Sequence, residues 1–231
     1  MTRPHSDRNF LAKRYARDAV IRGAAVGIFG AGFGVLAIDA GFSVLQALAM
    51  SLLVFTGASQ FSAASVLSTG GDPASAIGAA LLLAARNGLY GMTMAGHIDG
   101  SLGKRMAAAH ITIDESTALG VGQDNPDDVE GAFFAGGLSV FFFWNLGTLA
   151  GALGGQALGD ADALGLDAAF ASGFISLAMP ALRSSEGRTA AIAGSVIAAV
   201  GSLVFRPGIP IILAGLGAFV AYRIHARGNP A

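Results

Sequence analysis

The sequence predicts an all-α fold, a polytopic integral membrane helical bundle with about six or seven membrane segments. Hydrophobic residues make up 53% of the 231 residues, and Asp, Glu, Lys and Arg together make up only 13%, about half the share usual in soluble domains. The mean hydropathy is +0.61. The 34 glycines follow no collagen period and lie inside apolar runs, which is typical of packed transmembrane helices.

Seven apolar windows follow a basic N-terminal segment over residues 1–20. They form a membrane domain over residues 21–222, and a C-terminal tail covers residues 223–231. About 20 apolar residues cross the hydrocarbon core, and the first window is too long for a secretory signal, so we expect it to be retained. The windows are Ile21–Ile38, Val44–Leu67, Ala74–Ala95, Ala132–Leu158, Ala168–Leu182, Thr189–Phe205 and Ile209–Tyr222.

A polar insert over residues 97–130 separates the third and fourth windows. Its first part, 102–119, is compatible with a helix, and its second part, 120–130, is typical of an acidic loop. Short cytoplasmic loops carry an excess of Lys and Arg. If one early segment enters and returns without crossing, Lys104 and Arg105 join the basic N-terminus in the cytoplasm and only Arg206 is misplaced. We therefore predict a cytoplasmic N-terminus and a cytoplasmic insert.

The second window is the best candidate for a broken or re-entrant segment. Thr56-Gly57-Ala58-Ser59-Gln60 interrupts it halfway with hydroxyls, an amide and a flexible backbone. A broken helix exposes N–H groups that bind carboxylates, and the Ser59 and Gln60 oxygens would accept from an ammonium. The alternative is close packing of small residues. The fifth window, with Ser172-Gly173, is a weaker candidate for its counterpart in an internal repeat.

Arg86 lies near the centre of the third window and is the sharpest single feature of the sequence. A central arginine costs about 2.5 to 3.5 kcal/mol on insertion scales, so it must face protein or water and have a partner. One hypothesis is that it holds an anionic group, most simply a substrate carboxylate, through a bidentate fork. The alternatives are a structural ion pair, for example with Asp39, or a side chain that snorkels to the interface.

The remaining features predict helix packing and no catalysis. Gly23/Gly27, Gly30/Gly34 and Gly147/Gly151/Gly155 fit small-xxx-small contacts, and Trp144-Asn145 favours an interhelical hydrogen bond over a ligand contact. The chain has no Cys, which excludes thiolate chemistry and disulfides. All four histidines, His5, His97, His110 and His225, lie outside the apolar windows. We therefore expect neither an enzyme nor a metal or cofactor site.

Several residue groups together resemble the AzlC-type branched-chain amino acid permease family. Gly57-Ala58-Ser59-Gln60-Phe61 resembles its most recognisable motif, Arg86 followed by Leu89-Tyr90-Gly91 its arginine motif, and Asp114-Glu115 its Thr-Asp-Glu signature. The Trp144 to Gly151 stretch and Met179-Pro180-Ala181 agree in order and spacing. The chain departs from the family pattern at Ala84-Ala85, Asn87 and Ile113.

The resemblance implies a transporter subunit of the bacterial cytoplasmic (inner) membrane. It would export branched-chain or other small apolar amino acids with a small AzlD-type helical membrane subunit as partner, and it needs no nucleic acid. The leading alternative is a structural or channel-like subunit in which Arg86 only braces helices. The predicted substrate-binding residues are Thr56, Gly57, Ala58, Ser59, Gln60, Arg86 and Tyr90, and the candidate proton carriers are Asp39, Asp114 and Glu115.

Overall fold

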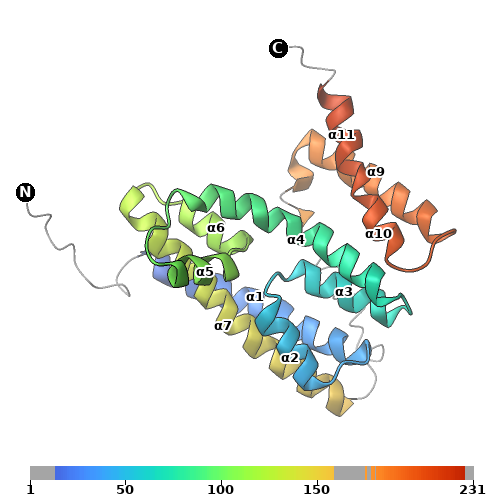
Figure 1. Cartoon of the computed structure of the whole chain (residues 1–231), viewed down its shortest axis with the longest axis horizontal. Helices are drawn as coiled ribbons and strands as arrows, with labels where there is room; N and C mark the ends of the chain where they lie inside the picture. The colour runs from blue at the N-terminus through green and yellow to red at the C-terminus, as the bar shows by residue number, and fades with distance from the viewer. Residues whose placement is uncertain (1–13, 159–174, 176–177, 180, 227–231) are drawn as a thin grey trace, which may run out of the picture.

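The computed structural model describes residues 14–158, 175, 178–179 and 181–226. Within these ranges the chain is built of helices and turns, without a strand, as predicted (Figure 1). In chain order the helices are α1 Arg14–Asp39, α2 Val44–Leu53, α3 Ala58–Ser68, α4 Pro73–Ala95, α5 Leu102–His110, α6 Asp114–Val121, α7 Pro126–Leu158, the short 3-10 helix η3 Ala181–Arg183, α9 Ser185–Ser202, α10 Ile209–Ala214 and α11 Leu216–Ala226.

A parallel pair of long helices, α1 and α7, forms the centre of the bundle. Gly27 packs against Phe143, and the later Gly34 packs against the later Thr148. Both helices therefore run in the same direction. A methyl group added at Gly151 would overlap the backbone of α1. Small residues allow such close backbone approach, which confirms the predicted packing role of these glycines.

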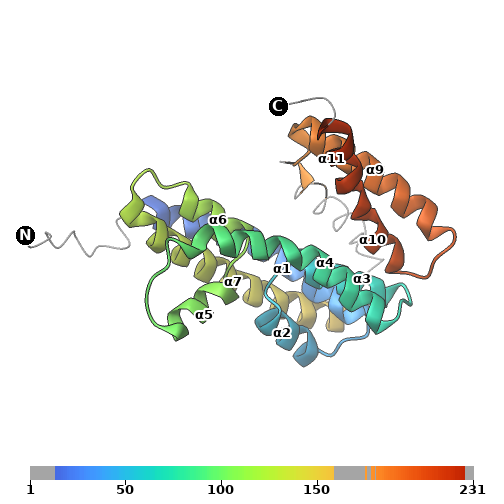
Figure 2. The ribbon, with the colours of Figure 1, turned by 45° about the horizontal axis from the view of Figure 1, so that its top comes forward.

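The predicted interruption of the second segment is confirmed as a break between α2 and α3. The two helices form a hairpin, because Phe42 before α2 and Leu67 near the end of α3 line the same cavity. Figures 1 and 2 show the outer ends of α2 and α3 at the same end of the molecule. The buried hydroxyls of Ser51 and Thr148 share a hydrogen bond of 3.2 Å, which fastens α2 to α7.

Helix α4 leads back from this hairpin toward the N-terminal end of α1. Asp72 caps its first turn by accepting hydrogen bonds from the backbone N–H groups of Ala74 and Ser75, and Pro73 suits the first helical position because its φ is fixed. The Ser75 hydroxyl also donates to Asp72 at 2.8 Å. These hydrogen bonds lower the pKa of Asp72, because they favour the ionised carboxylate.

The polar insert lies at the same end of the bundle as the start of α1. Tyr15 and Ala19 of α1 form a buried cluster with Leu119 of α6 and Ala132 of α7. The helix-compatible stretch of the insert is two helices, α5 and α6, rather than one. The predicted acidic loop is shorter than expected, because α7 already begins at Pro126.

Helices α9, α10 and α11 form an arm beside the bundle (Figure 2). α10 attaches it to α4, where Ile212 lies against Gly78. The last predicted segment, 209–222, is divided in the structure, because α10 ends at Ala214 and α11 begins at Leu216. The proposed counterpart of the break in the fifth window, Ser172-Gly173, lies outside the described residues.

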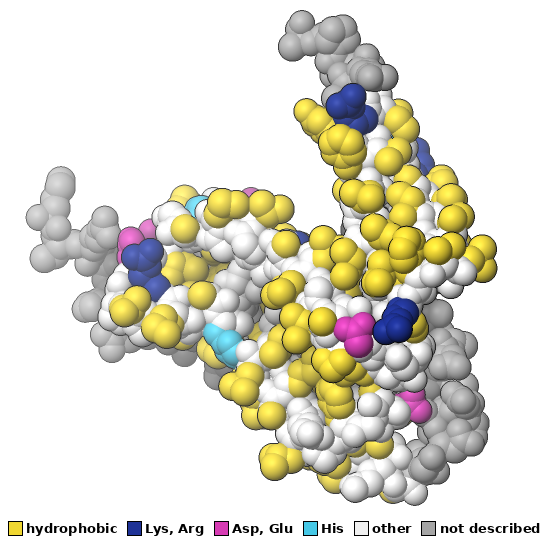
Figure 3. Space-filling view, turned by 45° about the vertical axis from the view of Figure 1, so that its right-hand side comes forward, with side chains coloured by type: hydrophobic (Ala, Val, Ile, Leu, Met, Phe, Trp, Pro, Cys, Tyr) yellow, Lys and Arg dark blue, Asp and Glu magenta, His cyan; other side chains and the backbone are white. Residues whose placement is uncertain are grey.

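Large apolar side chains cover much of the surface, as Figure 3 shows for one face. Ile28 is 74% exposed, Leu81 65% and Leu203 85%. Contiguous exposed apolar surface of this kind is rare on soluble monomers and normal where lipid or another subunit covers it. Within the described residues, α1 and α7 are long and apolar enough to cross a membrane, which is consistent with the predicted membrane bundle without fixing its number of crossings.

Candidate functional site

One glutamine fixes the geometry of the break between α2 and α3. Gly57 precedes α3 with a φ of 56°, a conformation that residues with a side chain rarely adopt. The fully buried Gln60 side chain accepts from the Gly57 N–H at 3.1 Å and donates to the Met50 carbonyl at 3.2 Å. Gln60 therefore ties the start of α3 to the end of α2, and both ends of its amide are engaged by backbone groups rather than directed at the charged cavity, whose wall it does not join.

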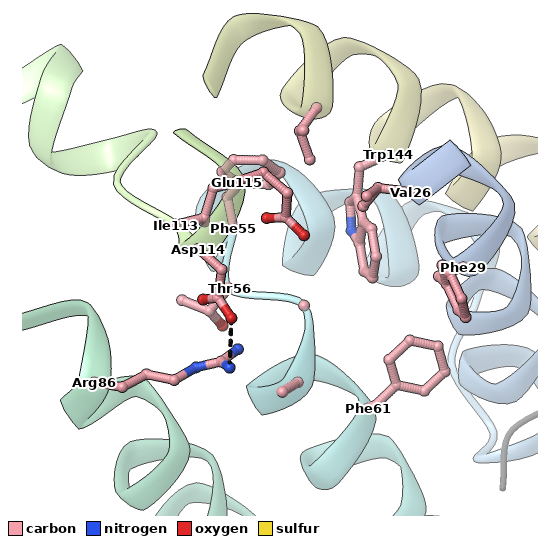
Figure 4. A pocket seen from close by; sticks show the side chains of 13 residues that line it. Val26, Phe29, Phe55, Thr56, Phe61, Arg86, Ile113, Asp114, Glu115 and Trp144 are labelled. Carbon is pink, nitrogen blue, oxygen red and sulfur yellow. Dashed lines mark hydrogen bonds and ion pairs between the residues drawn. The ribbon is translucent and has the colours of Figure 1, made fainter. Parts of the chain in front are cut away.

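A cavity of about 70 Å³ lies against this break. It has room for only a few waters, and most of its wall is apolar. Helices α1, α3, α4, α6 and α7 all contribute to it (Figure 4). Its lining residues are Val26, Phe29, Phe55, Thr56, Gly57, Ala58, Phe61, Arg86, Ile113, Asp114, Glu115, Val140 and Trp144.

Arg86 and Asp114 bring an ion pair to one side of the cavity. A guanidinium N–H of Arg86 (Nη1) donates to Asp114 Oδ2 at 2.9 Å, with the two side chains 36% and 40% exposed. The ion pair with Asp39 that the sequence offered is not formed, because Asp39 is the exposed last residue of α1. The guanidinium thus has a partner, yet its Nε–H is buried without one among the described residues.

Glu115 and Trp144 face each other across another part of the cavity. Figure 4 shows the Glu115 carboxylate directed toward the indole ring. Trp144 is 4% exposed, and its indole N–H has no partner within the described part of the chain. The Trp144 ring packs edge-on against Phe61, with centroids 6.1 Å apart, so the apolar wall also holds the indole in place.

The interhelical hydrogen bond expected for Trp144-Asn145 is not found among the residues that the structure describes. Asn145 donates to the carbonyl of Phe141 on its own helix at 2.7 Å. Trp144 instead lines the cavity. Sequence alone favoured packing because a tryptophan in the middle of an apolar window looks the same whether it faces a neighbouring helix or a cavity.

The structure gathers six of the predicted site residues around this cavity and leaves four away from its wall. Thr56, Gly57, Ala58, Arg86, Asp114 and Glu115 line it. Ser59, Gln60, Tyr90 and Asp39 do not. Tyr90 is one helical turn after Arg86 on α4 and lies near enough to interact with Asp114.

Ser59 lines a second cavity on the other side of α3. This cavity, of about 370 Å³, lies between the hairpin and α4 and has an apolar lining. Met50, Ala63 and Ala80 contribute to it. The buried Ser59 hydroxyl has no partner among the described residues, but it does not reach the charged cavity.

Sequence reasoning missed the aromatic and aliphatic wall of the charged cavity. Phe29 on α1, Phe61 on α3 and Val140 on α7 are far apart in the chain, and each sits in an ordinary apolar run. Phe61 alone had a signal, because it ends the first family motif. Among the described residues no group of three His, Asp or Glu side chains could hold a metal ion.

The helical bundle and its exposed apolar surface are consistent with a membrane protein that carries a charged cavity at a broken helix. The AzlC protein family model matches residues 23–158, more than half of the chain. The chain therefore belongs to the AzlC family.

Two relatives agree with this assignment. A branched-chain amino acid transport protein AzlC of Bacillus subtilis is 26% identical over 200 residues, 84% of this chain and 78% of its own length. An uncharacterized membrane protein of Helicobacter pylori is 29% identical over 175 residues, 75% of this chain and 76% of its own length. No solved structure matches the chain. Together these matches support a role in membrane transport and suggest a transporter rather than an enzyme.

Proposed function

We propose that this chain is the large subunit of an exporter of branched-chain or other small apolar amino acids in the bacterial inner membrane. The observation that carries the proposal is the cavity in which Arg86, the break before α3 and an apolar wall meet. An amino acid of this class offers a carboxylate, an ammonium and an apolar side chain. A site for it needs donors, an acceptor and an apolar surface together.

Arg86 and the first turn of α3 would hold the substrate carboxylate. Arginine carries a permanent charge with planar two-point geometry, and the N-terminal end of a half-helix favours an anion. Gly57 and Ala58 bring the backbone of that turn to the cavity. Because Asp114 already binds Arg86, the substrate carboxylate must displace or share this partner.

The apolar wall would receive the substrate side chain. Val26, Phe29 and Phe61 offer aliphatic and aromatic surface beside the charged groups. The cavity of about 70 Å³ is smaller than the pockets of ~300 Å³ or more that usually hold small molecules. Binding therefore requires the hairpin or a neighbouring helix to move, and the hinge-like break at Gly57 is the place where such movement would cost least.

We propose the following membrane topology for this subunit. With the N-terminus in the cytoplasm, the polar insert lies on the cytoplasmic side, and the α2–α3 hairpin enters from the opposite side and returns. Lys104 and Arg105 then satisfy the preference for basic cytoplasmic loops. A small AzlD-type helical subunit would cover part of the exposed apolar surface. Asp39, Asp114 and Glu115 remain candidate proton carriers.

The rival proposal is a structural or channel-like subunit in which Arg86 only braces α4 against α6, and the ion pair with Asp114 favours it. Counterflow of radiolabelled leucine in proteoliposomes, with and without the small subunit, separates the two, because a scaffold shows no counterflow. Equal rates for the single chain and the pair would end the proposed partnership.

Substitution at Arg86 makes the same test specific to the site. Arg86→Lys keeps the charge and loses the planar fork, so we expect counterflow to fall about tenfold or more while the protein still inserts. Arg206→Lys, at an exposed turn, is the matched control and should leave counterflow unchanged. Near-normal counterflow in assembled Arg86→Lys would return Arg86 to a bracing role.

A further inference from the structure

Polar groups that lack partners lie around the charged cavity. The buried indole N–H of Trp144 and the buried Nε–H of Arg86 have no hydrogen-bond partner among the described residues. The Glu115 carboxylate points into the space beside Trp144 (Figure 4). Buried polar groups in native proteins are nearly always paired. Two unpaired donors and a carboxylate around one cavity therefore indicate the position of a polar ligand.

We propose that Glu115 binds the ammonium of the substrate and that the indole N–H of Trp144 donates to its carboxylate beside Arg86. This inference rests on the proposed function, because it takes an amino acid as the ligand. It assigns the ammonium to a residue other than Ser59 and Gln60. Ser59 lies outside the charged cavity, and the Gln60 amide is occupied by the backbone on both sides of the break.

Charged and titratable groups on three helices act on Glu115. Asp114 precedes it on α6, Arg86 and Tyr90 face it from α4, and Arg22 acts on it from α1. The α7 residues that line the cavity, Val140 and Trp144, carry no charge. Arg86 is already bound to Asp114, and Glu115 forms no ion pair among the described residues, so Glu115 is the carboxylate of the cavity left for an ammonium.

The pairing has a direct consequence for pH dependence. An ionised Glu115 attracts an ammonium, and a protonated Glu115 does not. As the pH falls through the pKa of this carboxyl, the affinity for an amino acid should fall, approaching about tenfold per pH unit. A ligand with the same side chain and carboxylate but no ammonium gains nothing from the ionised form, so its affinity should not fall with pH in this way.

The experiment compares L-leucine with 4-methylpentanoate, which is leucine without its ammonium. Binding to the purified full-length chain, alone and with its co-expressed small subunit, is measured with radiolabelled ligands from about pH 5 to about pH 8. Trp144 is the single tryptophan of the chain, so its fluorescence reports events in the cavity independently. The variants are Glu115→Gln, Glu115→Asp and Trp144→Phe, with Glu186→Gln at the exposed start of α9 as control.

We expect Glu115→Gln to weaken leucine binding about 30-fold or more and to flatten its pH profile, while 4-methylpentanoate binds as tightly as before or more tightly. Glu115→Asp should keep the pH dependence. Trp144→Phe should weaken both ligands. If Glu115→Gln binds leucine with the affinity and pH profile of the unsubstituted protein, the ammonium assignment is wrong.

Two further outcomes keep the assignment separate from folding defects and from the proposed function. If Glu115→Gln does not fold, the unsubstituted protein still decides, because its preference for leucine over 4-methylpentanoate must shrink as the pH falls, and a constant preference overturns the assignment. Leucine binding that depends on Arg86 but not on Glu115 refutes this inference alone. No leucine binding, or binding that ignores Arg86→Gln, refutes the proposed function itself.

Discussion

The ion pair between Arg86 and Asp114 allows the binding and bracing roles of the arginine to be separated by one substitution. Asp114→Asn removes the charge that holds the guanidinium and keeps the size of the side chain. If Arg86 binds a substrate carboxylate, Asp114 competes for the same donors. Removing that competition should tighten the binding of a carboxylate ligand.

The size of the effect follows from the geometry. The two side chains are 2.9 Å apart but 36% and 40% exposed, so solvent screens the pair and its net worth is close to the ~1 kcal/mol upper range of exposed ion pairs. A gain of ~1 kcal/mol corresponds to about fivefold tighter binding. We expect this gain for 4-methylpentanoate, which presents only the carboxylate.

Binding and thermal unfolding are both measured, on Asp114→Asn, Arg86→Gln and the double variant. In the binding role, Asp114→Asn tightens 4-methylpentanoate binding only when Arg86 is present, and Arg86→Gln abolishes the gain. In the bracing role, Asp114→Asn and Arg86→Gln lower the melting temperature alike and neither improves binding. Unchanged or weaker binding in folded Asp114→Asn refutes the competition between Asp114 and the substrate.

Two further predictions concern the helix packing and the topology. Gly151→Leu should prevent normal assembly, because its side chain would overlap the α1 backbone and overpacking costs about 1 to 3 kcal/mol or more. Gly154→Leu on the same helix meets open space and should assemble normally. Yield and gel-filtration profile in detergent compare the two variants, and equal profiles would contradict the packing. In this Cys-free chain, Ser101→Cys should react with a membrane-impermeant maleimide only after cells are opened. Thr69→Cys at the α3–α4 turn should react in intact cells. Labelling of both positions from outside would exclude the re-entrant topology.

The location of the break was predictable because its signal is local. Thr56-Gly57 inserts polar and flexible residues into an apolar window; α2 ends at Leu53, and α3 begins directly after Gly57, whose φ is 56°. The role of Gln60 was not predictable in the same way. Whether a buried amide faces a ligand or the backbone of Met50 depends on how α2 folds back against α3.

The sequence by itself determined the helical membrane class, the break, the glycine spacing of the central helices and the need of Arg86 for a partner. These features depend on hydropathy, turn residues and small-residue periodicity, which act over a few neighbouring positions. Tertiary structure alone decided which carboxylate pairs with Arg86, since Asp39 and Asp114 are both acceptable by charge. It also decided that Glu115 and Trp144 meet in one cavity. Such contacts depend on the rotation and direction of whole helices, above all on the parallel packing of α1 and α7, and no local pattern encodes that rotation.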